Sequence, residues 1–243
     1  MKQKERLGFA RLRNSVRLDL KVQARYSFPQ IYAYVTAVYV VLFLATGLHR
    51  TFPPLLPLFL LSEPGMLGYT FAAAQVHFER GQGSAVALAV TPLRTGEYVL
   101  GKCIASAITA ASAGLLLYAL VVGMDTRLLW LLPPLALTAA AFGLLGMGLS
   151  AGYDDFARFL FTTMPPVQVI LVALPALLLL GMVPGSWFAW TPSYQALSAF
   201  ALLAGGRPDP FRYLFQVGYL GLSVVVVYRW AVGRFEAARE TWG

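Results

Sequence analysis

The sequence predicts an all-α protein that crosses a membrane with six helices. Hydrophobic residues make up 58% of the 243-residue chain and charged residues only 12%, whereas a soluble domain is usually about half apolar and a quarter charged. With so few charges to face water, a bilayer is the expected solvent. The apolar residues gather in long, uninterrupted stretches. The strands of a membrane β-barrel would be shorter and would alternate in polarity, so these stretches predict helices.

Six apolar stretches are long enough to cross a bilayer core of about 30 Å, which takes roughly 20 helical residues. We number them spans one to six and place them, in chain order, at residues 27–48, 54–76, 96–122, 129–151, 159–183 and 211–232. The whole chain, 1–243, is then a single transmembrane domain: a six-span bundle over residues 27–232, preceded by an arm (1–26) and followed by a tail (233–243).

The arm before span one is basic and amphipathic. Eight of the 19 Lys and Arg residues precede Tyr26, among apolar residues such as Leu12, Val16 and Leu20. A helix of this kind suits the membrane interface, with its cations directed toward anionic headgroups or toward a partner. The candidate interface residues are Arg17, Asp19, Lys21 and Arg25.

Six spans place both termini on one side of the membrane, and the charge distribution indicates which side. With the termini in the cytosol, the cytosolic segments hold 15 Lys and Arg residues and the opposite side holds four. Because basic segments favour the cytosolic side, we expect a multi-pass protein of the plasma (bacterial inner) membrane with both termini cytosolic. The net charge of +8 gathers at span ends, which favours membrane lipids as partners over nucleic acid.

Residues 77–102, between spans two and three, read HFERGQGSAVALAVTPLRTGEYVLGK. The run SAVALAV at 84–90 can form about two helical turns. Pro92 ends that run, because proline lacks an N–H donor and pushes Thr91 away from helical dihedral angles. Thr95 is a candidate N-cap for span three. We therefore predict a short helix across the cytosolic face, placed to present a rigid knob to a soluble partner.

A second short helix is predicted between spans five and six. Thr191 is a suitable N-cap, Pro192 suits the first helical position, and the run YQALSAFALLA ends at Gly205. The helix is too short to span a bilayer, so we expect it on or within the outer leaflet.

The chain is predicted to bind no cofactor and no metal of its own. Residues 96–103, GEYVLGKC, approach the phosphate-loop pattern, but Cys103 stands where Ser or Thr would bind Mg²⁺. The stretch also continues into an apolar span instead of following a strand. One cysteine and two distant histidines, His49 and His77, form no metal-binding cluster.

Glu63 lies about 13 Å into span two at 1.5 Å of rise per residue. A carboxylate at that depth costs at least about 2.5 kcal/mol unless it is paired, protonated or hydrated. It is either a contact for a cationic or zwitterionic substrate, or part of a gate, or a cap for N–H groups freed where Pro64 and Gly65 break the helix.

Aromatic residues and glycines mark two other helix faces. Tyr32, Tyr39 and Phe43 share a face of span one, where they either line a drug-binding cavity or pack against neighbouring helices. Together with Glu63 they form the candidate substrate pathway. Small residues in span four predict close helix packing within the chain; they are Gly143, Gly146, Gly148 and Gly152.

The stretch FERGQGSAVALAVTPLRTGEYVLGK resembles the signature between spans two and three of the membrane subunits of type-2 ABC exporters. Those subunits show an acidic–basic pair, a glycine, a short apolar helix, a Thr-Pro-Leu or Ser-Pro-Leu, and a Lys in the next span. The matching residues are Glu79, Arg80, Gly81 or Gly83, Thr91, Pro92, Leu93 and Lys102. The arm, with Asp19, Leu20, Gln23 and Arg25, the six spans and the helix before span six extend the resemblance, which is closest to drug, particularly fluoroquinolone, exporters.

The resemblance implies a permease subunit rather than an enzyme. It implies pairing with a second permease chain, identical or related, and with two separate ATPase subunits that bind ATP and Mg. Residues 84–90 would be the coupling helix, adding Ser84, Ala85 and Leu88 to the contact residues. The cargo would be a hydrophobic or amphipathic, drug-like or lipid-like molecule moved out of the cytoplasm or inner leaflet. Because SAVALAV carries no charge, the helix would dock by apolar packing.

Two other classes of function stay open. An ion-coupled secondary transporter would usually show inverted repeats with helices broken at matching positions; spans two and five both contain prolines, but the flanking sequences differ. A membrane-embedded lipid-modifying enzyme would need clustered acids, histidines or a Ser–His arrangement, whereas Glu63 stands alone within a span.

Overall fold

A computed structural model describes residues 2–81, 94–182, 189–205 and 209–239, and these residues form helices and turns without a strand. Six helices or helix runs are long and apolar enough to cross a membrane. They are Phe28–Thr46, Leu55–Gly81, Thr95–Val121, Arg127–Ser150, Phe156–Leu179 and Pro210–Ala238. The predicted all-α class is therefore confirmed, and six helices of spanning length lie where the six spans were predicted. The largest differences are at the ends of span two, which continues to Gly81 instead of residue 76, and of span six, which continues to Ala238 instead of residue 232.

The structure divides these runs into shorter elements. Span two consists of α4, the π-helical segment η1 and α5, and span five consists of α9, the π-helical segment η2 and α10. The elements are α1 (Lys2–Arg25), α2 (Phe28–Thr46), α3 (Leu48–Thr51), α4 (Leu55–Ser62), η1 (Glu63–Gly68), α5 (Tyr69–Gly81), α7 (Thr95–Val121), α8 (Arg127–Ser150), α9 (Phe156–Gln168), η2 (Val169–Ala173), α10 (Leu174–Leu179), α11 (Pro192–Ala204) and α12 (Pro210–Arg239).

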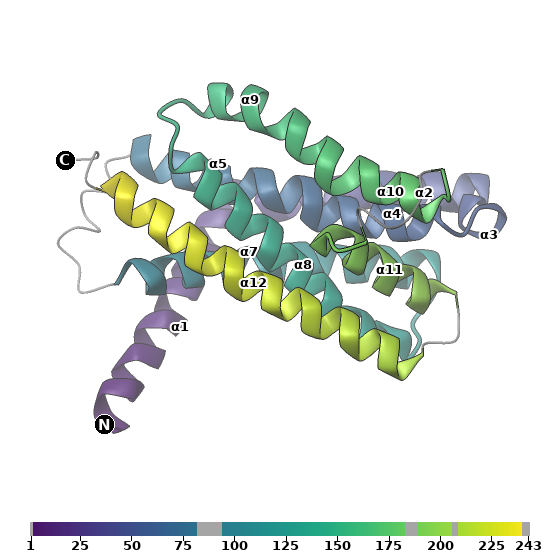
Figure 1. Cartoon of the computed structure of the whole chain (residues 1–243), viewed down its shortest axis with the longest axis horizontal. Helices are drawn as coiled ribbons and strands as arrows, with labels where there is room; N and C mark the ends of the chain where they lie inside the picture. Colours follow the sequence, from purple (N-terminus) through teal and green to yellow (C-terminus); the bar gives the residue numbers. More distant parts are fainter. Residues whose placement is uncertain (1, 82–93, 183–188, 206–208, 240–243) are drawn as a thin grey trace.

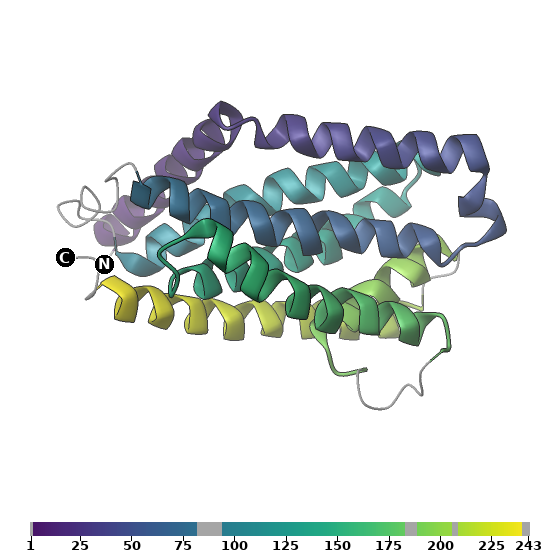
Figure 2. The same ribbon diagram turned by 90° about the horizontal axis from the view of Figure 1, so that it is seen from above.

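The long helices run side by side around a central pair, α7 and α8 (Figures 1 and 2). More than half of the residues in the apolar segments of α7 and α8 are buried, whereas few residues of α2, α9–α10 and α12 are buried. The exposed faces carry large apolar side chains such as Val41, Phe161 and Val226, as expected of helices that face lipid. The start of α1 and the end of α12 lie at the same end of the bundle, and α1 leaves that end at an angle (Figures 1 and 2).

The prolines of spans two and five do not break their helices. Pro64 is the second residue of η1, and Pro165 and Pro166 lie inside α9 just before η2. Each proline removes an N–H donor from the helix, and both spans continue past these sites through wider π-helical turns. The expectation that Pro64 and Gly65 interrupt span two, leaving Glu63 to cap freed N–H groups, is therefore wrong.

Of the two predicted N-caps, Thr191 is confirmed and Thr95 is wrong, and Asp155 is a third cap that was not predicted. The Thr191 side chain accepts a hydrogen bond from the Tyr194 N–H (3.3 Å), and α11 starts at Pro192 as expected. Asp155 caps α9 by accepting from the Ala157 and Arg158 N–H groups. At α7 the N-cap is Arg94 instead of the predicted Thr95, and the Glu97 carboxylate accepts the Arg94 N–H (3.2 Å).

Helix α11 packs within the bundle. Its side chains at Ala196, Leu197 and Phe200 are completely buried, and the helix lies against α4, α8 and α12. A placement on the outer leaflet stays a prediction, but α11 is part of the packed core.

Glycines of α8 bring it close to two neighbouring helices, as predicted. A Cβ at Gly146 would lie 2.2 Å from the Tyr69 carbonyl oxygen, so the α5 backbone occupies the space of the missing side chain. A Cβ at Gly148 would lie 2.4 Å from the Trp230 ring of α12. These close approaches hold α5 and α12 against α8 within one chain.

Replacing Gly146 with alanine is expected to destabilise the protein, because the new Cβ meets backbone that cannot rotate away. Gly143→Ala is the matched control: it lies one turn earlier in α8, and its Cβ would stand 3.7 Å from the Ala72 Cβ, an ordinary contact. Both changes gain up to about 1 kcal/mol of helix propensity, so Gly143→Ala should keep or raise the midpoint of thermal unfolding in detergent while Gly146→Ala lowers it. Equal midpoints would contradict the proposed backbone contact.

Candidate functional site

A buried charge cluster joins three helices at the end of the bundle where α5 ends and α7 begins. Lys102 of α7 is 1% exposed. Its ammonium group donates to the Asp19 carboxylate of α1 (2.9 Å) and to the Glu79 carboxylate of α5. The Tyr98 hydroxyl donates to the second Glu79 oxygen (2.7 Å), and Lys102 lies over the Tyr98 ring. Helix α1 is thus attached to the bundle by ionic contacts.

Neutral polar groups continue the cluster toward the middle of the bundle. The Gln75 amide donates to the same Asp19 oxygen that binds Lys102 (3.1 Å). The side-chain amide nitrogen of Gln23 lies within hydrogen-bond distance of the Gln75 and Ser106 side chains. The Thr109 hydroxyl donates to the side-chain amide oxygen of Gln23 (2.6 Å). We call Asp19, Gln23, Gln75, Glu79, Tyr98, Lys102, Ser106 and Thr109 the α1 clasp.

The charges of the clasp do not balance, since one lysine faces two carboxylates. Burial raises the pKa of Asp19 above its ordinary value, and the nearby Glu79 adds to this effect. The Lys102 ammonium opposes both by attraction and by its hydrogen bond. The net effect is a raised pKa for Asp19, because the cost of burial exceeds the attraction of Lys102.

Arg80, next to Glu79, points to a different part of the molecule. Its guanidinium donates to the carbonyl oxygens of Ala151 and Tyr153, both at 2.8 Å. These carbonyls follow the end of α8 and precede α9, so Arg80 supplies donors where a helix end leaves acceptors free. The His77 ring, one turn earlier on α5, packs against Phe156 and Phe159 of α9.

The structure brings together Asp19, Glu79 and Lys102, which the sequence assigned to two separate sets. Lys102 and Glu79 were expected at a partner contact, but Lys102 is enclosed and the two side chains bind each other, with Lys102 also bound to Asp19 of α1. Gly81 ends α5 at an exposed position. The other predicted coupling residues, Gly83, Ser84, Ala85, Leu88, Thr91, Pro92 and Leu93, lie outside the described residues.

The basic face of α1 is exposed, as an interface helix requires. Arg17, Lys21 and Arg25 all lie on the exposed side, whereas Asp19 and Gln23 are buried against the bundle. The inner face of α1 is therefore polar, and the helix docks through hydrogen bonds and an ion pair more than through the apolar face that the sequence suggested.

Sequence reasoning gave no site role to Gln75, Tyr98, Ser106 or Thr109. The sequence does contain a local pattern that could have indicated these residues. Three polar pairs have a spacing of four residues, which places the two members of each pair on one helix face. The pairs are Asp19 and Gln23, Gln75 and Glu79, and Tyr98 and Lys102. Polar pairs of this spacing inside apolar spans indicate a shared polar interface, but they do not indicate which helices meet there.

Glu63 lies fully buried in η1 and accepts a hydrogen bond from Thr36 of α2 (3.0 Å). Its second oxygen has no hydrogen-bond partner among the described residues. Two residues further on, a Cβ at Gly65 would lie 3.6 Å from the Val172 side chain of η2, and the Gln168 amide at the end of α9 lies 3.5 Å from the Gly65 carbonyl oxygen. The middle of span two therefore lies near the junction of α9 and η2.

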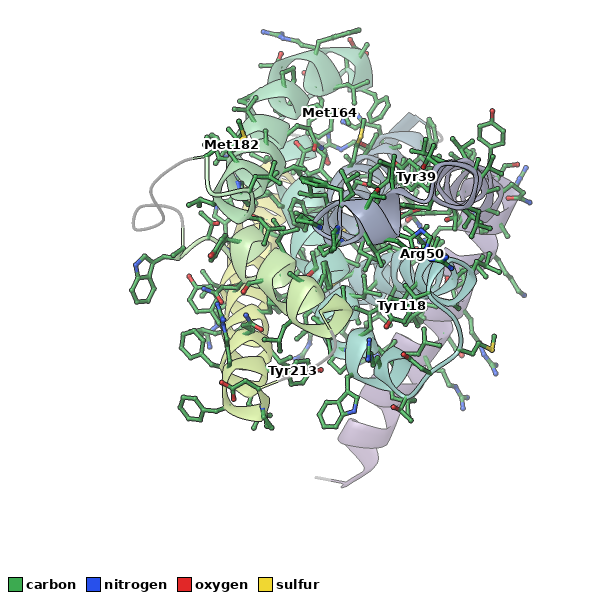
Figure 3. The ribbon with its side chains drawn as sticks, turned by 90° about the vertical axis from the view of Figure 1, so that its right-hand side faces the viewer. Tyr39, Arg50, Tyr118, Met164, Met182 and Tyr213 are labelled. Carbon is green, nitrogen blue, oxygen red and sulfur yellow. The ribbon has the colours of Figure 1, made fainter. Side chains whose placement is uncertain are left out.

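The aromatic residues of the candidate substrate pathway pack within the chain. Tyr32 and Phe43 are buried, and Tyr39 lies between α2 and α4 (Figure 3), near Phe59 and the Ser62 hydroxyl. Phe43 also contacts Phe59, edge to face. These contacts join α2 to α4, and contact with a substrate stays a prediction.

Among the described residues, no group of three or more His, Cys, Asp or Glu side chains is arranged to hold a metal ion. Comparison with known proteins adds no assignment: no protein-family model matches the chain, and no curated protein matches its sequence. A function must therefore be argued from the sequence pattern together with the geometry of the clasp.

Replacing Lys102 with methionine is expected to destabilise the protein strongly. Met keeps the length of the side chain but leaves Asp19 and Glu79 buried side by side without a cation, a change that costs on the order of 3 kcal/mol. Asp19→Asn is the matched control, because it removes one of two carboxylates and leaves Lys102 paired with Glu79. Thermal unfolding in detergent should show the larger loss for Lys102→Met; equal losses would contradict the ionic role of Lys102.

The raised pKa of Asp19 predicts a pH-dependent difference between the wild type and Asp19→Asn. An acid whose pKa is raised in the folded state contributes stability that is present below its unfolded pKa and is lost as pH rises through the folded value. The wild type should therefore lose stability relative to Asp19→Asn as pH rises from acidic to neutral. The measurement is the midpoint of unfolding of both proteins across that range, with the exposed-site variant Glu236→Gln as control. A difference that does not change with pH would contradict the assignment.

Proposed function

We propose that this chain is the membrane subunit of an ATP-binding-cassette exporter, a permease that moves a hydrophobic or amphipathic, drug-like or lipid-like substrate out of the cytoplasm or inner leaflet. ATP and Mg would be bound by two separate ATPase subunits, so the permease itself is not an enzyme. A second permease chain, identical or related, would complete the transporter. Both termini would face the cytosol at the plasma membrane.

The observation that carries the proposal is the geometry at the two ends of the signature stretch. Glu79 lies near the start of the stretch and Lys102 at its end, and the two side chains are bound to each other. The end of α5 and the first turns of α7 are thus fastened together, and α1 is fastened to both through Asp19. A segment that passes force from a motor to membrane helices needs a stiff base, and the clasp provides one.

The arrangement of the bundle supports the same function. The start of α1, the end of α12, the end of α5 and the start of α7 all lie at one end of the molecule (Figures 1 and 2). The exposed cations of α1 and the signature stretch would therefore face the same compartment, as docking to cytosolic ATPase subunits and to anionic headgroups requires.

One observation favours an ion-coupled secondary transporter as the second candidate. Glu63 is a carboxyl group buried within a span, beside a π-helical segment, with one oxygen lacking a partner among the described residues. Ionisable residues at such depth often belong to ion or proton pathways. This candidate predicts transport driven by an ion gradient without ATP.

The two candidates differ in what drives transport by inside-out vesicles. For an exporter subunit, uptake of a fluorescent amphipathic drug should require the co-expressed ATPase subunit and hydrolysable ATP. Leu88→Glu should prevent co-purification of that subunit, because a charge in the apolar run opposes burial in an apolar cleft. Glu236→Gln, a change at an exposed residue of α12, is the control and should co-purify normally.

Transport by the chain alone under an ion gradient would contradict the exporter proposal and favour the second candidate. Normal co-purification and transport with Leu88→Glu would contradict apolar docking through residues 84–90.

A further inference from the structure

Glu79 and Arg80 are adjacent in the sequence, yet their side chains hold different neighbours. Consecutive side chains of an α-helix are about 100° apart around its axis, since one turn takes 3.6 residues. Glu79 therefore faces α7, where it binds Lys102 and Tyr98, and Lys102 in turn binds Asp19 of α1. Arg80 faces the α8–α9 turn, where it binds two backbone carbonyls.

Each of the two contacts is supported one turn earlier on α5. Gln75, four residues before Glu79, binds Asp19 of α1. His77, three residues before Arg80, packs on Phe156 and Phe159 of α9. The last two turns of α5 thus present one polar face to α1 and α7 and a second face to the α8–α9 turn.

We infer that Glu79 and Arg80 are positioning residues that form a branch point. A displacement of the end of α5 is passed through Glu79 to α7 and, by way of Lys102, to α1. It is passed independently through Arg80 to the α8–α9 turn. The inference deepens the proposed function. It rests on that function at one point only, which is that the ATPase subunits are the source of the displacement of α5. The two sets of contacts belong to this chain alone.

The chemistry of the two arms suits rigid transmission. Glu79 reaches a lysine that is itself enclosed and bound to a second carboxylate, so the ion pair is only slightly exposed to water and weakly screened. The Arg80 guanidinium donates from two nitrogens to two carbonyls, and this planar fork fixes both the position and the orientation of the turn. Asp155 then caps α9 two residues after Tyr153, so the turn is held from both sides.

The variants Glu79→Gln and Arg80→Met should separate the two arms in the purified chain. Amide hydrogen exchange, followed by mass spectrometry, would be compared over residues 11–25 of α1 and over residues 151–160 of the α8–α9 turn. Glu79→Gln should raise exchange in α1 at least about tenfold, equivalent to about 1.4 kcal/mol less for local opening, and leave the turn within about twofold of wild type. Arg80→Met should do the reverse.

The control variants are Glu236→Gln and Arg229→Met, which each remove an exposed charge from α12. Neither should change the hydrogen exchange of either region. If Glu79→Gln fails to fold, Tyr98→Phe removes a single hydrogen bond to Glu79 and should raise exchange in α1 to a smaller extent. The branch point would be overturned if each variant raised hydrogen exchange equally in both regions, or if neither variant raised it in either region.

This outcome is independent of the proposed function, because it is measured without an ATPase subunit. In the assembled transporter, each variant should lower transport per ATP hydrolysed while co-purification stays normal. Failure to find any ATPase partner would contradict the proposed function and leave the exchange result intact.

Discussion

The burial of Lys102 between Asp19 and Glu79 is the interaction on which this end of the molecule depends. Removing an ammonium group from water costs several kcal/mol unless partners replace its hydration, and Lys102 has two carboxylates and an aromatic ring. One of those carboxylates belongs to α1, a helix outside the spans. Helix α1 must therefore stay docked for the lysine to keep both carboxylates, and this ion pair helps to fix the position of the arm.

This constraint explains why α1 has polar residues on both sides. A helix that simply lies in the membrane interface buries an apolar face, whereas α1 buries Asp19 and Gln23 and exposes Arg17 and Lys21. Its inner face matches the polar ends of α5 and α7. Deeper in the bundle the contacts change in kind, because Gly146 and Gly148 let α8 approach α5 and α12 closely enough for van der Waals packing.

Local patterns in the sequence predicted the spans, the helix over Pro192–Ala204 and the close packing at the α8 glycines, because hydropathy, capping and small residues act within one segment. The clasp was not predicted as a unit, since Asp19 and Lys102 are 83 residues apart and nothing local pairs them. Glu63 was expected next to a helix break at Pro64, yet the helix continues as a π-helix. Propensity identifies where a helix is weakened, but packing against α7 and α8 decides whether it breaks.

The clasp and the π-helical segment η1 divide span two into two regions with different contacts. At the end of α5, an ion pair and an arginine that donates to two carbonyls hold the helix to α7 and to the α8–α9 turn, and Lys102 links it to α1. Midway along the span, the η1 backbone is π-helical, and Gln168 at the end of α9 donates a 3.5 Å hydrogen bond to the Gly65 carbonyl oxygen. A force applied at the end of α5 would therefore move that end together with its neighbours and bend span two where its hydrogen bonding is least regular. Glu63 stands at that place with a single partner on Thr36, so bending there would change the surroundings of a buried carboxyl group.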